Sequence, residues 1–78
     1  MNNQNTSLSE FLKEKRKASK LTQPELAAKA GVGLRFIRDL EQGKSTLRMD
    51  KVNQVLVLFG YELAPLPINR DKLLNENS

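Results

Sequence analysis

Two closely spaced helix signals between residues 21 and 44 constrain the fold of this chain more than any other feature of its sequence. Thr22 and Glu25 have the spacing of a capping box, in which each side chain bonds the other residue's backbone N–H. Pro24 falls in the first turn, where a missing N–H is harmless. Together with apolar positions at helical spacing, these residues predict a helix over about residues 23–30.

A second helix follows after a turn of about three residues. Gly31 tolerates the positive φ that ends a helix, and Gly33 is an acceptable N-cap for the next one. That next helix is predicted over Leu34–Gln42, with Gly43 as its C-terminal stop. Two short helices joined by such a turn form a helix-turn-helix arrangement.

Further helices are predicted on both sides of this unit. Ser7 and Glu10 repeat the capping-box spacing before an apolar stripe and predict a helix over about residues 8–18. Apolar residues from Met49 to Phe59 fall on one side of another helix, which Gly60 closes. The predicted fold class is therefore all-α, with four or five short helices.

The segment after these helices predicts contact with a second chain. Residues 61–66 are compatible with a short strand, which the prolines at 65 and 67 confine to an edge. A lone strand must pair with something, and a symmetry mate is the simplest partner. Apolar residues outside the core stripe of the last helix also indicate a second partner. We therefore expect a homodimer with an interface at Val57, Leu58, Tyr61, Leu63 and Leu66.

The length of 78 residues allows one domain. We expect a flexible N-terminus at 1–7, a domain at 8–66 and a flexible tail at 67–78. No apolar run is long enough to span a membrane, and residues 1–7 lack the features of a signal peptide. The expected protein is soluble and intracellular.

The residue types present argue against catalysis. The chain has neither histidine nor cysteine, so it lacks the commonest general base and the commonest metal ligands. Its acidic residues are not clustered either. We expect no catalytic residue, no metal site and no cofactor.

The charge distribution suits a polyanionic partner. Residues 1–58 carry 11 Lys or Arg and 6 Asp or Glu, a net charge of +5, while residues 59–78 have a net charge of −1. Positive charge on the helical body is typical of proteins that bind nucleic acids. A merely soluble basic surface would explain the charge alone equally well.

The helix at 34–42 is the candidate for reading DNA, because the second helix of a helix-turn-helix lies in the major groove. Arginine can bond guanine O6 and N7, an apolar side chain can pack on a thymine methyl, and glycine permits close approach. Ile37 and Leu40 are expected to lie in the core, so the opposite face of this helix is expected to face solvent. The candidate base-reading residues are Gly33, Leu34, Arg35, Arg38 and Asp39.

Two neighbouring segments are candidates for binding the DNA backbone. The first is the start of the helix at 23–30, where the helix N-terminus adds free amides and partial positive charge. The second is the loop after Gly43. Such contacts set register and not sequence preference. The candidate phosphate ligands are Thr22, Gln23, Lys44, Ser45 and Thr46.

Each of these residues also has a purely structural explanation. Leu34 and Phe36 could belong to the core, and Thr22 is a cap whatever else it does. Arg35, Arg38 and Asp39 could form a solvated face with internal ion pairs. The joint occurrence of these residues with a glycine turn and a basic body favours DNA binding.

Residues 21–27 and 31–44 together resemble the lambda-repressor-like, XRE-type helix-turn-helix family, through an ordered Leu-Thr-Gln…Leu-Ala…Gly-Val…Ile…Leu-Glu…Gly pattern. Residues 31–44 and 59–63 are similar to the HipB-like antitoxin branch. The resemblance implies a dimer on a palindromic operator, paired C-terminal strands and an ion pair between Arg16 and Glu41. It further implies a HipA-like serine/threonine kinase toxin as partner, repression of the protein's own operon, and a bacterial, cytoplasmic, nucleoid-associated location.

The sequence departs from this family at the start of the expected reading helix. Many relatives have Ser or Thr at the position of Gly33 and Gln at the position of Leu34, so the operator sequence cannot be carried over. Three alternatives stay open. They are a stand-alone regulator such as a restriction-modification controller or phage-type repressor, a protein-interaction module without DNA binding, and an enzyme.

Overall fold

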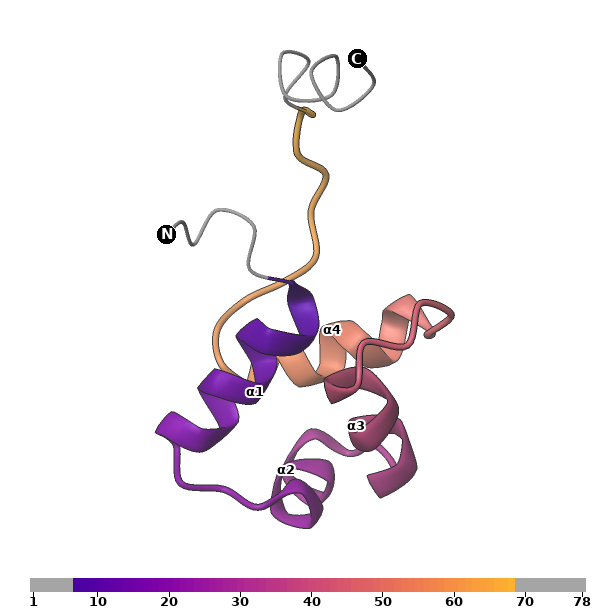
Figure 1. Cartoon of the computed structure of the whole chain (residues 1–78). Helices are drawn as coiled ribbons and strands as arrows, with labels where there is room; N and C mark the ends of the chain where they lie inside the picture. The colour runs from indigo at the N-terminus through magenta and orange to yellow at the C-terminus, as the bar shows by residue number, and fades with distance from the viewer. Residues whose placement is uncertain (1–6, 69–78) are drawn as a thin grey trace.

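The structure, a computed structural model, describes residues 7–68, which form four α-helices and no strand (Figure 1). The helices are α1 (Leu8–Ala18), α2 (Gln23–Ala30), α3 (Leu34–Glu41) and α4 (Met49–Leu58). The predicted all-α class is confirmed. The ends predicted for α3 and α4 are each one residue too late, because Gln42 and Phe59 are C-caps.

Residues 1–6 and 69–78 lie outside the described part of the chain. They include most of the two terminal segments predicted to be flexible. No helix within residues 7–68 has the length and apolar character needed to cross a membrane.

Hydroxyl caps begin α1 and α2. Thr22 Oγ1 accepts from the Glu25 N–H at 3.2 Å, and Glu25 Oε1 accepts from the Thr22 N–H at 2.8 Å, so this capping box is complete. Ser7 Oγ accepts from the Glu10 N–H at 3.2 Å, but the described bonds contain no return bond to the Glu10 carboxylate. The box predicted for α1 is thus only half formed. An exposed carboxylate gains little by exchanging water for that bond.

Three of the four helices end in a Schellman motif, with a left-handed residue just after the C-cap. In α4 the Tyr61 N–H donates to the Leu56 carbonyl at 2.9 Å, around Gly60 with φ +85°. Gly43, with φ +83°, is the left-handed residue after α3. After α1 the position is occupied by Lys20, which adopts φ +59° although it has a Cβ.

All four helices contribute to one apolar core. α2 and α3 lie side by side, and α1 and α4 cover them (Figure 1). Partly buried side chains, among them Leu34, Phe36 and Leu63, pack around this centre. The buried apolar residues are Leu12, Leu26, Ala27, Ile37, Leu40, Val52, Val55 and Leu56.

After α4 the chain crosses back to α1. The Tyr61 ring packs edge-on against Phe11, with centroids 4.9 Å apart. The Lys15 ammonium lies 5.2 Å from the Tyr61 ring centroid and 5.5 Å from that of Phe11. These contacts stabilise the start of the C-terminal segment against α1.

Beyond this anchor, residues 64–68 run away from the helices (Figure 1). Just before them, the Leu63 N–H donates to Asn53 Oδ1 of α4 at 2.8 Å. The strand predicted at 61–66 does not form within the single chain, because a strand needs a partner for its backbone. Its pairing with a second copy stays a prediction.

Candidate nucleic-acid interface

The two faces of α3 have opposite character. Ile37 and Leu40 are 0% and 2% exposed and fix the inner face in the core. Arg35 and Arg38 lie on the exposed face, and neither has an ion-pair partner among residues 7–68. Two free guanidinium groups therefore project from a convex helix, in the orientation that the sequence predicts.

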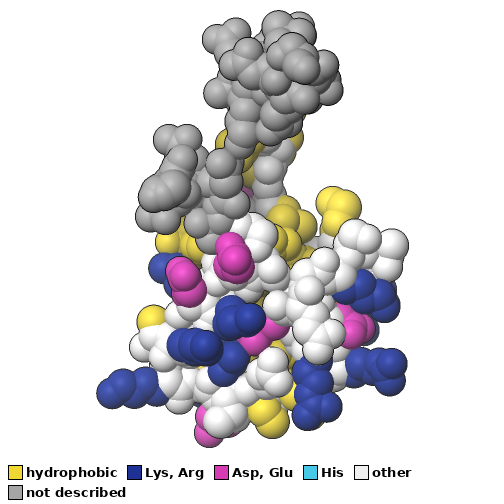
Figure 2. Space-filling model, in the orientation of Figure 1, with side chains coloured by type: hydrophobic (Ala, Val, Ile, Leu, Met, Phe, Trp, Pro, Cys, Tyr) yellow, Lys and Arg dark blue, Asp and Glu magenta, His cyan; other side chains and the backbone are white. Residues whose placement is uncertain are grey.

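The basic side chains of this face are widely spread. Lys and Arg side chains lie over α1 and around α3, with acidic side chains between them (Figure 2). A polyanion would meet positive charge from both of these helices here. The electrostatic potential of such a surface attracts a charged partner but contributes little to the recognition of a particular base sequence.

The N-terminus of α3 is open. Its N-cap, Gly33, has no side chain to bond the first turn, and the described bonds contain no partner for the N–H groups of Leu34, Arg35 and Phe36. A Cβ built on Gly33 would meet nothing within 4 Å, and its φ of −75° suits any residue. Neither the backbone conformation nor the packing of the isolated chain therefore requires glycine here.

The N-terminus of α2 is much less open than its sequence suggests. The N–H groups of Thr22 and Glu25 are used by the capping box, and Pro24 has none. The prediction of several free amides is therefore wrong, because only the Gln23 N–H lacks a partner among the described residues. The side-chain amide of Gln23 also turns inward and donates to Glu41 Oε1 at 3.1 Å.

Glu41, at the end of α3, is the centre of a network that joins three segments. Arg16 of α1 binds it with two parallel bonds, from Nε to Oε2 at 2.7 Å and from Nη2 to Oε1 at 3.0 Å. Arg16 Nη1 also donates to the Leu21 carbonyl at 2.8 Å. With the bond from Gln23, this network ties α1, the start of α2 and the end of α3 together.

The charges of this network are shielded from water, since the side chains of Arg16 and Glu41 are 13% and 3% exposed. Burial by itself would raise the pKa of Glu41, but hydrogen bonds from Arg16 and Gln23 outweigh it and lower that pKa below its ordinary value. The bond to Glu41 raises the pKa of Arg16. Both groups are held in their charged forms.

In the loop after α3, Lys44 forms an ion pair with an acidic residue of that helix. Lys44 Nζ lies 3.6 Å from Asp39 Oδ2, and both side chains are partly exposed. Asp39, a candidate for reading bases, is therefore paired with Lys44, a candidate phosphate ligand. Ser45 and Thr46 are exposed beside them.

Two comparisons with known proteins bear on this arrangement. The family profile described as Helix-turn-helix matches residues 12–66, which is most of the chain. The chain belongs to the XRE-type helix-turn-helix family. Its helix-turn-helix consists of α2, the turn at 31–33 and α3.

A curated relative is the "Uncharacterized HTH-type transcriptional regulator y4mF" of Sinorhizobium fredii. It is 60% identical over 45 residues, which are 58% of this chain. The match covers 59% of that protein, so the chain spans about three fifths of the length of the relative it matches.

Within the helix-turn-helix, the candidate base-reading residues differ in how far they are exposed to a DNA partner. Leu34 is half buried and packs against the core, so only part of its side chain is available to a thymine methyl. Phe36 is likewise half buried, in agreement with a role in the core. The residues that face solvent freely are Gly33, Arg35 and Arg38.

Two amide side chains that contribute to this site were not among the residues predicted from the sequence. Gln42 lies four residues after Arg38 and is exposed, so it extends the outward stripe of α3. The helical spacing from Arg35 would have revealed it. Gln54 Nε2 of α4 donates to the Ala30 carbonyl at 3.2 Å and supports the turn, and no local signal in the sequence could show this.

Proposed function

We propose that this protein is a sequence-specific DNA-binding transcriptional repressor that acts as a homodimer on a palindromic operator. The observation that carries the proposal is the orientation of α3, whose outer face bears Arg35 and Arg38 without internal partners. The second helix of a helix-turn-helix enters the major groove, where arginine reads guanine. The name of the relative, a transcriptional regulator, supports the same role.

In this proposal the open N-terminus of α3 approaches the bases. The absence of a side chain at Gly33 leaves room for DNA at a point where the isolated protein does not need glycine. Leu34, Arg35, Arg38 and Asp39 complete the base-reading set. The phosphate ligands are Thr22, Gln23, Lys44, Ser45 and Thr46, with Gln23 contributing its backbone N–H since its side chain is held by Glu41.

The dimer is proposed from the apolar surface at the other end of the domain. Val57, Leu58, Tyr61 and Leu66 are 64%, 40%, 45% and 84% exposed, and Leu63 is half buried beside them. A single domain of this size does not usually leave so many large apolar side chains in water. A dimer would present two α3 helices, expected about 34 Å apart, to successive major grooves.

We further propose that the repressor is the antitoxin of a HipA-like kinase toxin and that the pair represses its own operon. This finer proposal rests on the resemblance of residues 31–44 and 59–63 to HipB-like proteins. Co-expression with a kinase-like protein encoded next to the gene tests it. We expect a stable complex and relief of the kinase's toxicity, whereas the absence of both would leave a stand-alone regulator.

A comparison of two substitutions at Arg35 tests the reading of DNA. Arg35→Ala should weaken binding to the selected operator by about 1–3 kcal/mol and flatten the preference at one base pair. Arg35→Lys keeps the charge but loses the planar fork, so it should flatten the same preference while binding to random DNA is retained. Selection of bound fragments from random DNA, followed by titration at fixed salt, measures both quantities.

Two outcomes would contradict the proposal. No binding to any duplex at low salt would exclude DNA as the partner. Unchanged affinity and preference in both variants would remove Arg35 from the base-reading residues. Because Arg35 is exposed and unpaired among the described residues, neither substitution should alter the fold, which circular dichroism can check.

A further inference from the structure

Leu34 and Arg35, the first two residues of α3, form a pair with one apolar and one cationic side chain. Leu34 is half buried and packs against the core, so its exposed part is an apolar surface in a fixed position. Arg35 is exposed beside it. Phe36 follows Arg35, but it lies about 200° from Leu34 around the helix axis, on the other flank of the arginine.

Arg35 keeps its guanidinium free because the nearest acid along α3 is paired elsewhere. Asp39 lies four residues after Arg35, a spacing at which an acid and an arginine can pair on a helix. Its Oδ2 instead lies 3.6 Å from Lys44 Nζ, and the Lys44 N–H donates to the Asp39 carbonyl at 3.1 Å. Among residues 7–68, no carboxylate forms an ion pair with Arg35. The guanidinium is therefore available to guanine O6 and N7.

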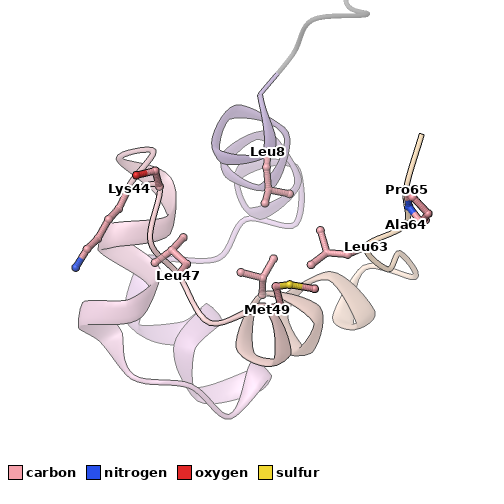
Figure 3. Close-up of a pocket in the computed structure, with 9 residues that line it drawn as sticks. Leu8, Lys44, Leu47, Met49, Leu63, Ala64 and Pro65 are labelled. Atoms are coloured by element: carbon pink, nitrogen blue, oxygen red, sulfur yellow. The ribbon is translucent and has the colours of Figure 1, made fainter. Parts of the chain in front are cut away.

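An apolar groove of about 570 Å³ lies elsewhere, between α1 and the start of α4 (Figure 3). None of the described residues that line it belongs to α2 or α3, and the side chain of Lys44 at its rim extends away from it (Figure 3). The groove shares Leu63 with the proposed dimer surface. An apolar contact beside Arg35 must therefore come from α3 itself. The apolar residues of the groove include Leu8, Leu47, Met49, Val52, Leu63 and Pro65.

A leucine distinguishes bases only through apolar contact. In the major groove, the apolar group that a base presents is the C5 methyl of thymine. 5-Methylcytosine carries the same methyl group at the same ring position, but in a pair with guanine. Leucine has no donor or acceptor with which to tell the amino group of cytosine from the O4 carbonyl of thymine. Leu34 therefore suits both methylated pyrimidines.

The side chains that many relatives have at these positions would behave differently. Glutamine at the position of Leu34 can bond adenine N6 and N7, and so would favour a T·A pair over any C·G pair. The serine or threonine of relatives at the position of Gly33 would project into open space, since a Cβ there meets nothing within 4 Å. At both positions this chain lacks polar groups that could distinguish T·A from a methylated C·G pair.

We propose that the operator carries a C5-methylated pyrimidine beside the guanine bound by Arg35, and that 5-methylcytosine serves there as well as thymine. Consecutive Cα atoms are about 3.8 Å apart and stacked base pairs about 3.4 Å, so Leu34 and Arg35 contact neighbouring pairs. A site with cytosine at this position is bound tightly only after that cytosine is methylated. The inference rests on the proposed function, because it needs α3 in the major groove.

Four duplexes test the inference on the parent protein. In both half-sites of the operator selected from random DNA, they carry thymine, uracil, 5-methylcytosine or cytosine beside the guanine whose preference Arg35→Ala flattens. Thymine and uracil differ by one methyl group, as do 5-methylcytosine and cytosine. A methyl group covered by Leu34 is worth about fourfold in affinity, so over two half-sites each methylated duplex should bind about 15-fold more tightly than its unmethylated counterpart. Fluorescence anisotropy at fixed salt measures the four dissociation constants.

Two variants assign the methyl contact to a residue. Leu34→Gln replaces the apolar surface by an amide, so both affinity ratios should fall below about threefold. Its preference for the neighbouring guanine should remain, because Arg35 is unchanged. Phe36→Ala, on the other flank of Arg35, is the matched control and should keep both ratios at about 15-fold. Circular dichroism confirms that the helices of both variants stay folded.

Equal binding of the methylated and unmethylated duplexes by the parent would overturn the inference. A thymine effect without a 5-methylcytosine effect would do so too, as would a selected operator with no thymine beside that guanine. Ratios that Leu34→Gln leaves unchanged, or that Phe36→Ala abolishes, would place the contact elsewhere and also overturn it. In all of these cases the operator is still bound, so the proposed function stands. Failure to bind any duplex at low salt contradicts the proposed function itself.

Discussion

Lys20 has an unfavourable backbone conformation for its residue type. It occupies the left-handed position that Gly43 and Gly60 occupy after two other helices, and its φ is +59°. A Cβ in this region costs about 1–2 kcal/mol, an amount that glycine avoids. The bonds of the Schellman motif, including that from the Leu21 N–H to the Arg16 carbonyl at 3.1 Å, hold it there.

We therefore expect Lys20→Gly to be more stable than Lys20→Ala by about 1 kcal/mol. Both variants lose the same charge, so their difference reports the backbone alone. Urea denaturation followed by circular dichroism measures the two free energies of unfolding. Equal stabilities would show that the left-handed conformation is not maintained in solution.

At the scale of the elements, the bonds around Glu41 decide how α3 is held against α1. The pKa of Glu41 is lower in the folded state than in the unfolded chain, so its charged form stabilises the fold. This contribution is fully present above the unfolded pKa of about 4.3. It is lost as the pH falls through the lower, folded pKa.

Glu41→Gln should remove this contribution and cost on the order of 2 kcal/mol at neutral pH, because Arg16 loses its charged partner. Its free energy of unfolding should also fall less steeply than that of the parent on acidification below pH 4.3 or so. Chemical denaturation at a series of pH values gives both results. An identical acid dependence in the two proteins would contradict the assignment.

Arg16→Met provides the matched test from the other side of the pair. It leaves Glu41 buried without its main hydrogen-bond donor, so burial then favours the neutral carboxyl. The destabilisation relative to the parent should therefore be smaller at pH 4 than at pH 7. A loss that does not depend on pH would mean that the guanidinium acts only through packing.

At the scale of the whole molecule, the proposed DNA complex depends on charges from two subunits. Binding should weaken steeply with salt, because each phosphate contact releases counterions. Lys44→Ala removes one cation per subunit, so it should reduce the slope of log K against log salt by about 1.8, twice the usual 0.9. It should weaken binding to all sequences alike, unlike Arg35→Ala.

Titration of one duplex at several salt concentrations measures this slope. Asp39→Asn is a useful control, because it releases Lys44 from its 3.6 Å partner without removing the cation. The slope of this variant should not fall. A slope that Lys44→Ala leaves unchanged would show that this loop does not touch a phosphate.

The features that local sequence predicted are those that depend on residues a few positions apart. The capping box of Thr22 and Glu25 and the terminating glycines at 43 and 60 lie within one helical turn of the groups they bond. The inward positions of Ile37 and Leu40 follow from helical periodicity, which also turns Arg35 and Arg38 outward. The pair between Arg16 and Glu41 came instead from family resemblance.

Only the tertiary structure decided which polar groups remain available. Gln23 turns inward because Glu41, 18 residues away, is brought beside it by packing. The side chain of Asn53 accepts a hydrogen bond from the Leu63 N–H, so this backbone group is not available to another partner. Hydrogen bonds within a turn are encoded by neighbouring residues, whereas these partners meet only after the helices have packed around the core.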